Sequence, residues 1–212
     1  METLQSSLSD NDDKEAASQV VTAARSRLNM LDAGVSIIEE SMMATEAFLK
    51  ARSGWNAVIN ADAAVREATA LAEEMSKENI LASQAKGNEA LAFLEEAQQD
   101  FSQAEAAYLS LDLAAFKAYV AKRIESQQAA LAADEAYLSR NKEELEAQNS
   151  RYNALEEEAA ALAQELGEDD PEQIVALRFY KEIEADQGAY EAERLKAGNA
   201  DAFLREYLGT AS

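Results

Sequence analysis

An apolar seam between residues 21 and 49 is the feature that most constrains the fold. Its members recur in alternating steps of three and four residues: Val21, Ala24, Leu28, Leu31, Val35, Ile38, Met42, Thr45 and Leu49. Residues with this spacing share one face of a helix, and a seam of four heptads is typical of a helix that packs along another helix. The pattern therefore predicts a long first helix. We expect it to end at Ser53-Gly54, because glycine readily adopts the left-handed conformation that follows a helix.

A second apolar face predicts a partner for this helix. Residues 56–84 carry smaller apolar side chains at helical spacing, so residues 14–86 are expected to form a long αα-hairpin. Trp55, the only tryptophan, falls at the expected turn. It has two interpretations: a plug that covers the end of the hairpin core, which we favour, or an exposed anchor for a partner.

Residues 87–208 are expected to continue the same bundle as further helical hairpins. Their firmest boundary is Gly167 to Pro171, where a glycine that ends one helix is followed by a proline suited to begin the next. Between 112 and 166, core residues recur every seven positions (Ile124, Leu131, Leu138, Leu145 and Tyr152, then Ala159 and Leu166). The intervening core positions are polar: Gln127, Asp134, Asn141 and Gln148. This stretch is either one helix or two. A similarity between residues 104–118 and 133–147 favours two, with turns near Ser110 and Ser139 and short helical-repeat character.

The fold class predicted is therefore all-α, an elongated antiparallel helical bundle built from coiled-coil hairpins. The single proline and seven glycines of the 212 residues fit long helices, and no run of residues reads as a strand. Residues 1–13 are polar and without periodicity, so we expect a disordered acidic tail, with Asp12 capping the first helix. Residues 209–212 are expected to form a short C-terminal tail.

The residues that are missing exclude most enzyme chemistry. The chain has no histidine and no cysteine, which removes imidazole bases, Ser-His-Asp triads, thiolate nucleophiles and the usual zinc and haem ligands. The acidic run Glu168 to Asp170 lacks the alternating ligands of a calcium loop, and helix capping explains it. We expect a protein that is not an enzyme, with no catalytic, cofactor or metal site.

Charge narrows the class of partner. There are 41 acidic and 19 basic residues, giving a net charge of −22. Such a surface repels phosphate backbones and anionic lipid headgroups, so we expect no nucleic-acid partner and no membrane association. No stretch approaches the roughly 20 apolar residues of a membrane span, and the N-terminus lacks the apolar region of a secretory signal. A cytoplasmic location is expected.

These observations favour a non-enzymatic helical scaffold or protein–protein interaction protein. Its partner would be another protein or a second copy bound through an apolar stripe left over on the first helix. The candidate interaction residues are Leu31, Ile38, Met42 and Trp55. The alternative is a helical cargo or chaperone module whose acidic face receives a basic partner, with binding that weakens steeply as salt is added.

The first half of the chain also resembles the small helical hairpin substrates of type VII secretion systems. Those proteins carry a Trp-x-Gly turn and a Tyr-x-x-x-Asp/Glu signal. Here Gly54-Trp55 has the opposite order and lacks the spacer, while Tyr108 to Asp112, Tyr152 to Glu156 and Tyr180 to Glu184 match the second signal. The resemblance implies an exported helical hairpin protein as a further alternative, and no functional residue is carried over from it.

Overall fold

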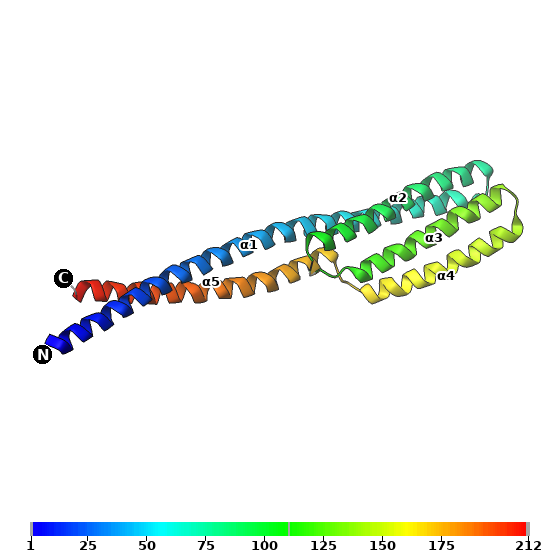
Figure 1. The fold of residues 1–212 in the computed structure, drawn as a ribbon. Coiled ribbons are helices and arrows are strands. Elements are labelled where there is room, and N and C mark those ends of the chain that lie inside the picture. Colours follow the sequence, from blue (N-terminus) through cyan, green and yellow to red (C-terminus); the bar gives the residue numbers. More distant parts are fainter. Residues whose placement is uncertain (1, 110, 211–212) are drawn as a thin grey trace. The chain divides into compact units, whose positions relative to one another are not determined.

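The computed structural model describes residues 2–109 and 111–210, and it consists of helices. They are α1 (Glu2–Ala72), α2 (Lys77–Ala107), α3 (Ala114–Leu138), α4 (Lys142–Leu166) and α5 (Pro171–Thr210) (Figure 1). No strand occurs within the described ranges. The all-α bundle predicted from the sequence is confirmed.

The chain forms two compact units, which we name by their contents. The bundle unit is Met43–Arg178 and contains the second part of α1, all of α2, α3 and α4, and the start of α5. The two-helix unit combines Met1–Met42 with Phe179–Ser212, so it pairs the first part of α1 with most of α5. This division differs from the predicted segments 14–86 and 87–208, because residues from opposite ends of the chain belong to one unit.

The bundle unit is a four-helix bundle with alternating helix directions. Phe101 and Phe116 bring α2 onto α3 with their ring centroids 5.8 Å apart, and Trp55 of α1 meets the ring of Phe116 edge-on at 5.6 Å. Neither phenylalanine is more than 1% exposed. α4 packs on α3, where the Ser126 hydroxyl donates to Glu156 at 2.5 Å. The centre of the core is thus aromatic, and Trp55 belongs to its edge.

Polar contacts tie the same helices together. The guanidinium of Arg123 on α3 lies 2.7 Å from Asp62 of α1 and 3.9 Å from Glu156 of α4, and it donates to the Tyr119 hydroxyl at 2.8 Å. Its side chain is only 13% exposed, so these partners compensate a charge that is largely removed from water. One arginine therefore links three helices of the bundle.

The break predicted at Gly54 is wrong, because α1 continues through it to Ala72. A Cβ at Gly54 would lie 2.9 Å from Cε1 of Phe101, so the glycine lets α2 approach α1. Gly87, at the predicted boundary between segments 14–86 and 87–208, lies inside α2, where a Cβ would lie 2.8 Å from Cδ2 of Leu131. Both glycines serve packing rather than helix termination.

The first turn of the chain lies instead at residues 73–76. Met75 adopts a left-handed conformation with φ of 48°, and its N–H bonds to the Ala72 carbonyl at 3.1 Å. Ser76 then caps α2 by accepting a hydrogen bond from the Asn79 N–H at 3.1 Å. Gly54-Trp55, the pair compared with the Trp-x-Gly turn of type VII substrates, therefore lies inside a helix and not at a turn.

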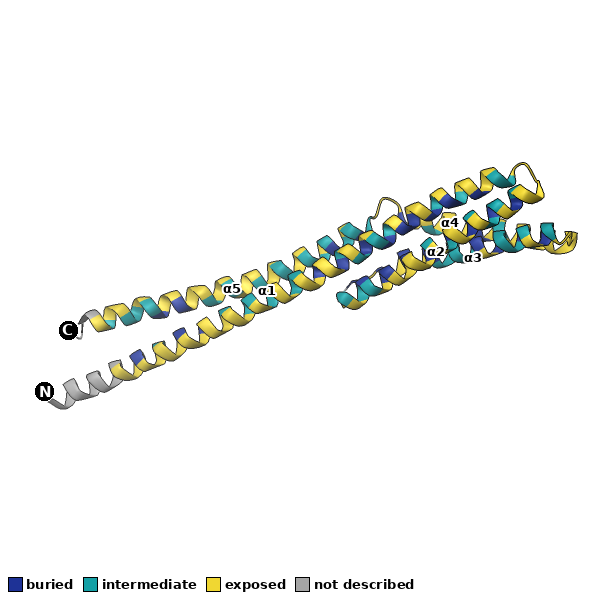
Figure 2. Cartoon of the chain, turned by 90° about the horizontal axis from the view of Figure 1, so that it is seen from above, coloured by how far each residue is buried: buried dark blue, intermediate teal, exposed yellow. Residues whose placement is uncertain are grey.

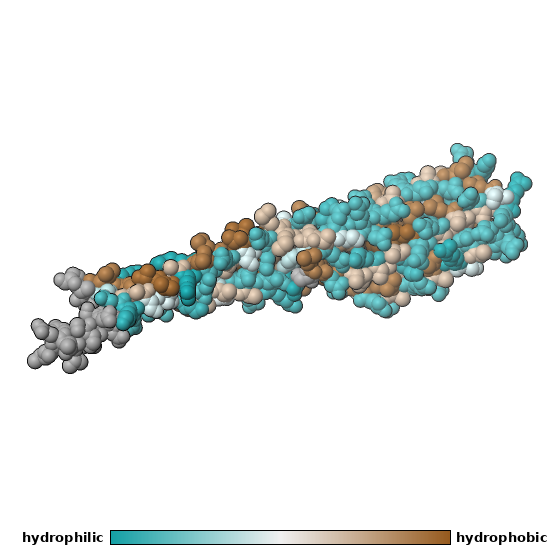
Figure 3. Space-filling model, in the orientation of Figure 1, coloured by the Kyte–Doolittle hydropathy of each residue, from teal (hydrophilic) through white to brown (hydrophobic). Residues whose placement is uncertain are grey.

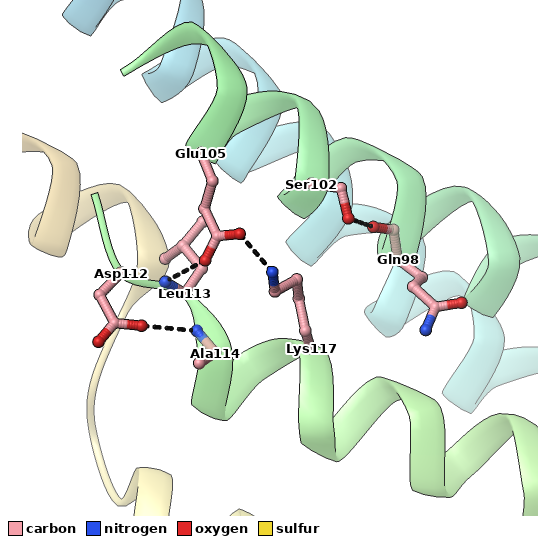
Figure 4. Close-up of polar contacts among 7 residues, drawn as sticks. All are labelled: Gln98, Ser102, Glu105, Asp112, Leu113, Ala114 and Lys117. Atoms are coloured by element: carbon pink, nitrogen blue, oxygen red, sulfur yellow. Dashed lines mark hydrogen bonds and ion pairs between the residues drawn. The ribbon is translucent and has the colours of Figure 1, made fainter. Parts of the chain in front are cut away.

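The two turns suggested by the internal similarity are present, so residues 112–166 form two helices. Ser110 itself lies outside the described residues, but α2 ends at Ala107 and α3 begins at Ala114. Glu105 holds this connection: it accepts the Leu113 N–H at 2.8 Å and pairs with the ammonium of Lys117 (Figure 4).

The turn near Ser139 is followed by a side-chain cap at the start of α4. The Asn141 side chain accepts the Glu144 N–H at 3.2 Å, and Arg140 before it is left-handed with φ of 57°. Such a cap satisfies an N–H that has no partner inside the helix. The local residues therefore suffice to start α4.

The boundary at Gly167 to Pro171 is also confirmed. Gly167 follows α4 with a positive φ of 60°, Asp170 accepts the Glu172 N–H at 2.8 Å, and Pro171 begins α5.

The predicted ends of the first and last helices are wrong. α1 begins at Glu2, so residues 2–13 are helical where a disordered tail capped by Asp12 was expected. α5 extends to Thr210 and so includes part of the tail predicted at 209–212; residues 211–212 lie outside the described ranges.

The cap at Asn141 yields a direct stability prediction. Asn141→Ala should destabilise the protein by about 1 kcal/mol, because the Glu144 N–H loses its acceptor. Asn153→Ala, an exposed position inside the same helix, is the matched control and should be neutral or slightly stabilising, since alanine has the higher helix propensity. Urea unfolding followed by circular dichroism measures both variants. Equal stabilities for the two would contradict a capping role for Asn141.

Candidate interaction surface on α1

α1 carries two different faces where it pairs with α5. Ala16, Ala23 and Ser26 are buried, with Met30 and Ile37 half-buried along the same line. Small side chains dominate the start of this face, which lets two helices approach closely. The face that packs on α5 is thus offset by two residues from the seam that the sequence analysis singled out.

The contacts between α1 and α5 show in which direction each helix runs. Arg27 of α1 pairs with Asp201 of α5 at 2.6 Å. Asp13, earlier in α1, accepts a hydrogen bond from the hydroxyl of Tyr207, later in α5. The hydrogen bond from Lys196 at 2.6 Å, reinforced by one from Ser26 of α1, lowers the pKa of Glu193. The two helices of this unit are therefore antiparallel.

The predicted seam lies on the opposite side of α1 and faces away from α5. We call its members within the two-helix unit the apolar stripe: Val21, Ala24, Leu28, Leu31, Val35, Ile38 and Met42. All seven are exposed, and Leu31, Ile38 and Met42 are 67%, 61% and 69% accessible. Exposed residues alternate with buried ones along α1 in Figure 2, and hydrophobic surface follows the α1–α5 pair in Figure 3. The expectation that this seam packs inside a hairpin is wrong.

The reason is a competition between two stripes with the same spacing. The side chains on the α5-facing line are smaller, so hydrophobicity alone favours the apolar stripe for the core. Close packing of two helices instead selects the line with small side chains. A seven-residue line of exposed aliphatic and alanine side chains is left without a cover among the described residues.

The four predicted interaction residues do not form one site. Leu31, Ile38 and Met42 share the apolar stripe, whereas Trp55 lies in the bundle unit against Phe116 and is half-buried. Of the two interpretations of Trp55, this packing fits a core residue, although it covers the interior of the bundle rather than a turn. We place the candidate interaction surface on the stripe alone.

Sequence reasoning missed a charge signal that accompanies the stripe. Residues 16–38 contain only three charged side chains, Arg25, Arg27 and Asp32, and so carry a net charge of +1 in a chain of net −22. Depletion of charge is typical of the centre of a protein interface. A sliding count of charged residues would have found this segment without any structure.

An apolar notch of about 300 Å³ lies beside the stripe. Arg27, Met30, Leu31 and Tyr190 line it. Leu31 belongs to the stripe and Tyr190 to α5, so the notch extends the apolar surface from the stripe toward α5.

The bundle unit holds a second, polar feature. Two polar core residues that interrupt the heptads, Gln127 and Asp134, line a cavity of about 190 Å³ together with Ser83 and Tyr152. Ser83 donates to Asp134 at 3.3 Å. Burial raises the pKa of Asp134, with the Ser83 hydrogen bond opposing it, and burial likewise raises the pKa of Tyr152. The cavity therefore holds one carboxyl group, which is hydrogen-bonded to Ser83.

The raised pKa of Asp134 predicts a pH dependence. The folded state holds this proton more tightly than the unfolded state, so the ionised carboxylate costs stability as pH rises from the unfolded pKa through the raised folded pKa. The stability gained by Asp134→Asn over the parent should therefore increase from acidic to neutral pH. Urea unfolding at several pH values measures the difference, with Glu135→Gln as the exposed control. A gain from Asp134→Asn that does not change with pH would contradict the assignment.

Among the described residues there is no cluster of three or more side chains able to hold a metal ion. None of the described helices combines the length and apolar character needed to cross a membrane.

Comparisons of the chain with protein-family models, with curated proteins and with solved structures find no match.

Proposed function

We propose that this protein is a non-enzymatic interaction or scaffold protein that binds a helical partner along the apolar stripe of α1. The observation that carries the proposal is the exposure of the stripe, with Leu31, Ile38 and Met42 each more than 60% accessible. Monomeric proteins rarely leave large contiguous apolar surfaces open to water, and those that do usually bind something there.

The spacing of the stripe supports a helical partner. Side chains at steps of three and four residues form the ridge of a coiled coil, into which an equally spaced helix inserts its own side chains. An extended strand has a side-chain period of two residues and would lose register with the stripe within a few positions. The partner therefore presents apolar side chains at heptad spacing.

The charges near the stripe separate this proposal from the cargo or chaperone alternative. A basic partner would seek the acidic surface, whereas residues 16–38 carry a net charge of +1. Binding at the stripe is driven by apolar burial and should change little between low and moderate salt. Binding that weakens steeply with added salt would favour the acidic face instead.

A photo-crosslinking amino acid at Ile38 tests the proposal in the cells that make the protein. We expect crosslinks to one protein or to a second copy, lost when Leu31 is also changed to aspartate, and none from the same group at Asn199. Asn199 is exposed in the two-helix unit but lies outside the stripe. Identical crosslinking from residues 38 and 199, or none from 38, would overturn the proposal.

A further inference from the structure

The apolar stripe is long enough to form a coiled coil by itself. From Val21 to Met42 it extends over about 32 Å at the helical rise of 1.5 Å per residue. Its members occupy the core positions of three heptads and the start of a fourth, with Val21, Leu28, Val35 and Met42 at position a and Ala24, Leu31 and Ile38 at position d. An uninterrupted run of this length predicts an occupant with the same periodicity.

The described residues of the two-helix unit leave this face exposed. α5 packs on the side of α1 that carries the buried residues Ala23 and Ser26. Each of these lies two positions after a member of the stripe, Val21 and Ala24. Two residues correspond to about 200° around a helix of 3.6 residues per turn, so the stripe and α5 lie on opposite sides of α1. A third helix can add to the stripe without displacing α5.

On the basis of the proposed function, we propose that the occupant is a second copy of this chain, with the two α1 stripes packed antiparallel. The low charge of residues 16–38 supports a second copy, because two such segments meet without the repulsion that a net charge of −22 creates elsewhere. A second copy also presents apolar side chains at the heptad spacing that the stripe requires of its partner.

Packing favours the antiparallel direction. With Leu28 placed opposite Leu31 of the second copy, the core layers become Val21 with Ile38, Ala24 with Val35, and Leu28 with Leu31, each occurring twice. A parallel, in-register pair would place Ala24 against its own copy and leave that layer underfilled. The antiparallel register combines each small side chain with a larger one.

Charge complementarity favours the same direction. In this register Arg25 lies beside Asp32 of the second copy on both sides of the interface, at the flanking e positions. Both side chains are exposed, and neither forms an ion pair with a described residue. A parallel pair would instead place Asp32 beside Arg27, which Asp201 already binds at 2.6 Å. The antiparallel dimer therefore pairs two charges that have no ion-pair partner among the described residues of the single chain.

Light scattering tests whether a second copy binds. We expect the purified 23.0 kDa chain to have twice that mass at micromolar concentration. Leu31→Asp with Ile38→Asp should return it to the monomer mass, while Leu195→Asp, an equally exposed leucine on α5, should leave the dimer intact. Unchanged circular dichroism and Trp55 fluorescence would show that the double variant still folds. A parent that is monomeric at about 100 µM overturns the proposal.

Charge exchange tests the direction. Arg25→Glu should weaken the antiparallel dimer roughly tenfold, because two attractive pairs become repulsive. Adding Asp32→Arg should restore affinity by re-forming both pairs with opposite sign. In a parallel dimer, Arg25→Glu would have little effect and Asp32→Arg would face Arg27. That result would overturn the antiparallel register.

Engineered cysteines give an independent test, since the chain contains none. A mixture of the Val21→Cys and Ile38→Cys chains should form a disulfide-linked dimer on mild oxidation, and each variant alone should not. A disulfide from Val21→Cys alone would contradict the antiparallel register, as it requires the two Val21 positions to face each other.

Failure of this inference and failure of the proposed function give different results. A monomeric parent whose residue 38 still crosslinks to another protein, with loss on Leu31→Asp, overturns the second copy and retains a helical partner. A monomeric parent without crosslinks at residue 38 overturns both.

Discussion

Phe101→Ala should destabilise the bundle unit by about 3–5 kcal/mol, the range for removing a fully buried phenylalanine. Phe101 has no exposed surface, contacts the ring of Phe116, and closes against α1 at Gly54. The neighbouring helices can collapse only partly into the space left behind. Urea unfolding measures the loss, and Trp55 reports it locally because its ring lies 5.6 Å from that of Phe116.

Phe93→Ala provides the matched control for this prediction. Phe93 belongs to the same helix but is only half-buried, so part of its surface is already in contact with water. We expect a cost well below that of Phe101→Ala. A similar loss at both positions would contradict the placement of the bundle core around Phe101 and Phe116.

Gly54→Leu should destabilise the same unit by about 3 kcal/mol through overpacking. Even a Cβ at this position would lie 2.9 Å from Cε1 of Phe101 and 3.2 Å from the Ala97 carbonyl oxygen. A leucine side chain can be accommodated only if α2 moves away from α1. The midpoint of urea unfolding should fall accordingly, and Trp55 fluorescence should show a changed environment for the folded state.

Gly188→Leu is the corresponding control within α5. A Cβ there would meet nothing within 4 Å, and the residue is exposed. Replacing a helical glycine by leucine at an open position should stabilise the helix by somewhat less than about 1 kcal/mol. Opposite signs at Gly54 and Gly188 are the expected result. Stabilisation at both would show that Gly54 does not mediate close packing.

Helix starts were predictable where the capping residues are neighbours in sequence. Asn141 with Glu144, and Asp170 with Glu172, form their contacts within a few residues. The steric and hydrogen-bonding requirements of a helix end are local, so a short stretch of sequence contains them. Gly167 belongs to this group, since its positive φ follows from its place after α4.

Gly54 and Gly87 could not be interpreted in the same way. A glycine after a helical run is compatible with a helix end and with close packing inside a longer helix. The choice depends on what lies opposite, here Phe101 for Gly54 and Leu131 for Gly87. Both partners are more than 40 residues away in sequence. The predicted hairpin turn was therefore misplaced to Gly54, and the actual turn at residues 73–76 was missed.

Some features of the candidate site likewise follow from the sequence, and others only from the tertiary structure. The sequence by itself determined an all-helical chain, the heptad spacing of the stripe, and the absence of histidine and cysteine chemistry, because these depend on residue type and local periodicity. Only the tertiary structure decided which of two equally spaced lines on α1 is covered. α5 packs on the line through Ala23 and Ser26, whose small side chains permit close approach, and so leaves Leu31, Ile38 and Met42 exposed.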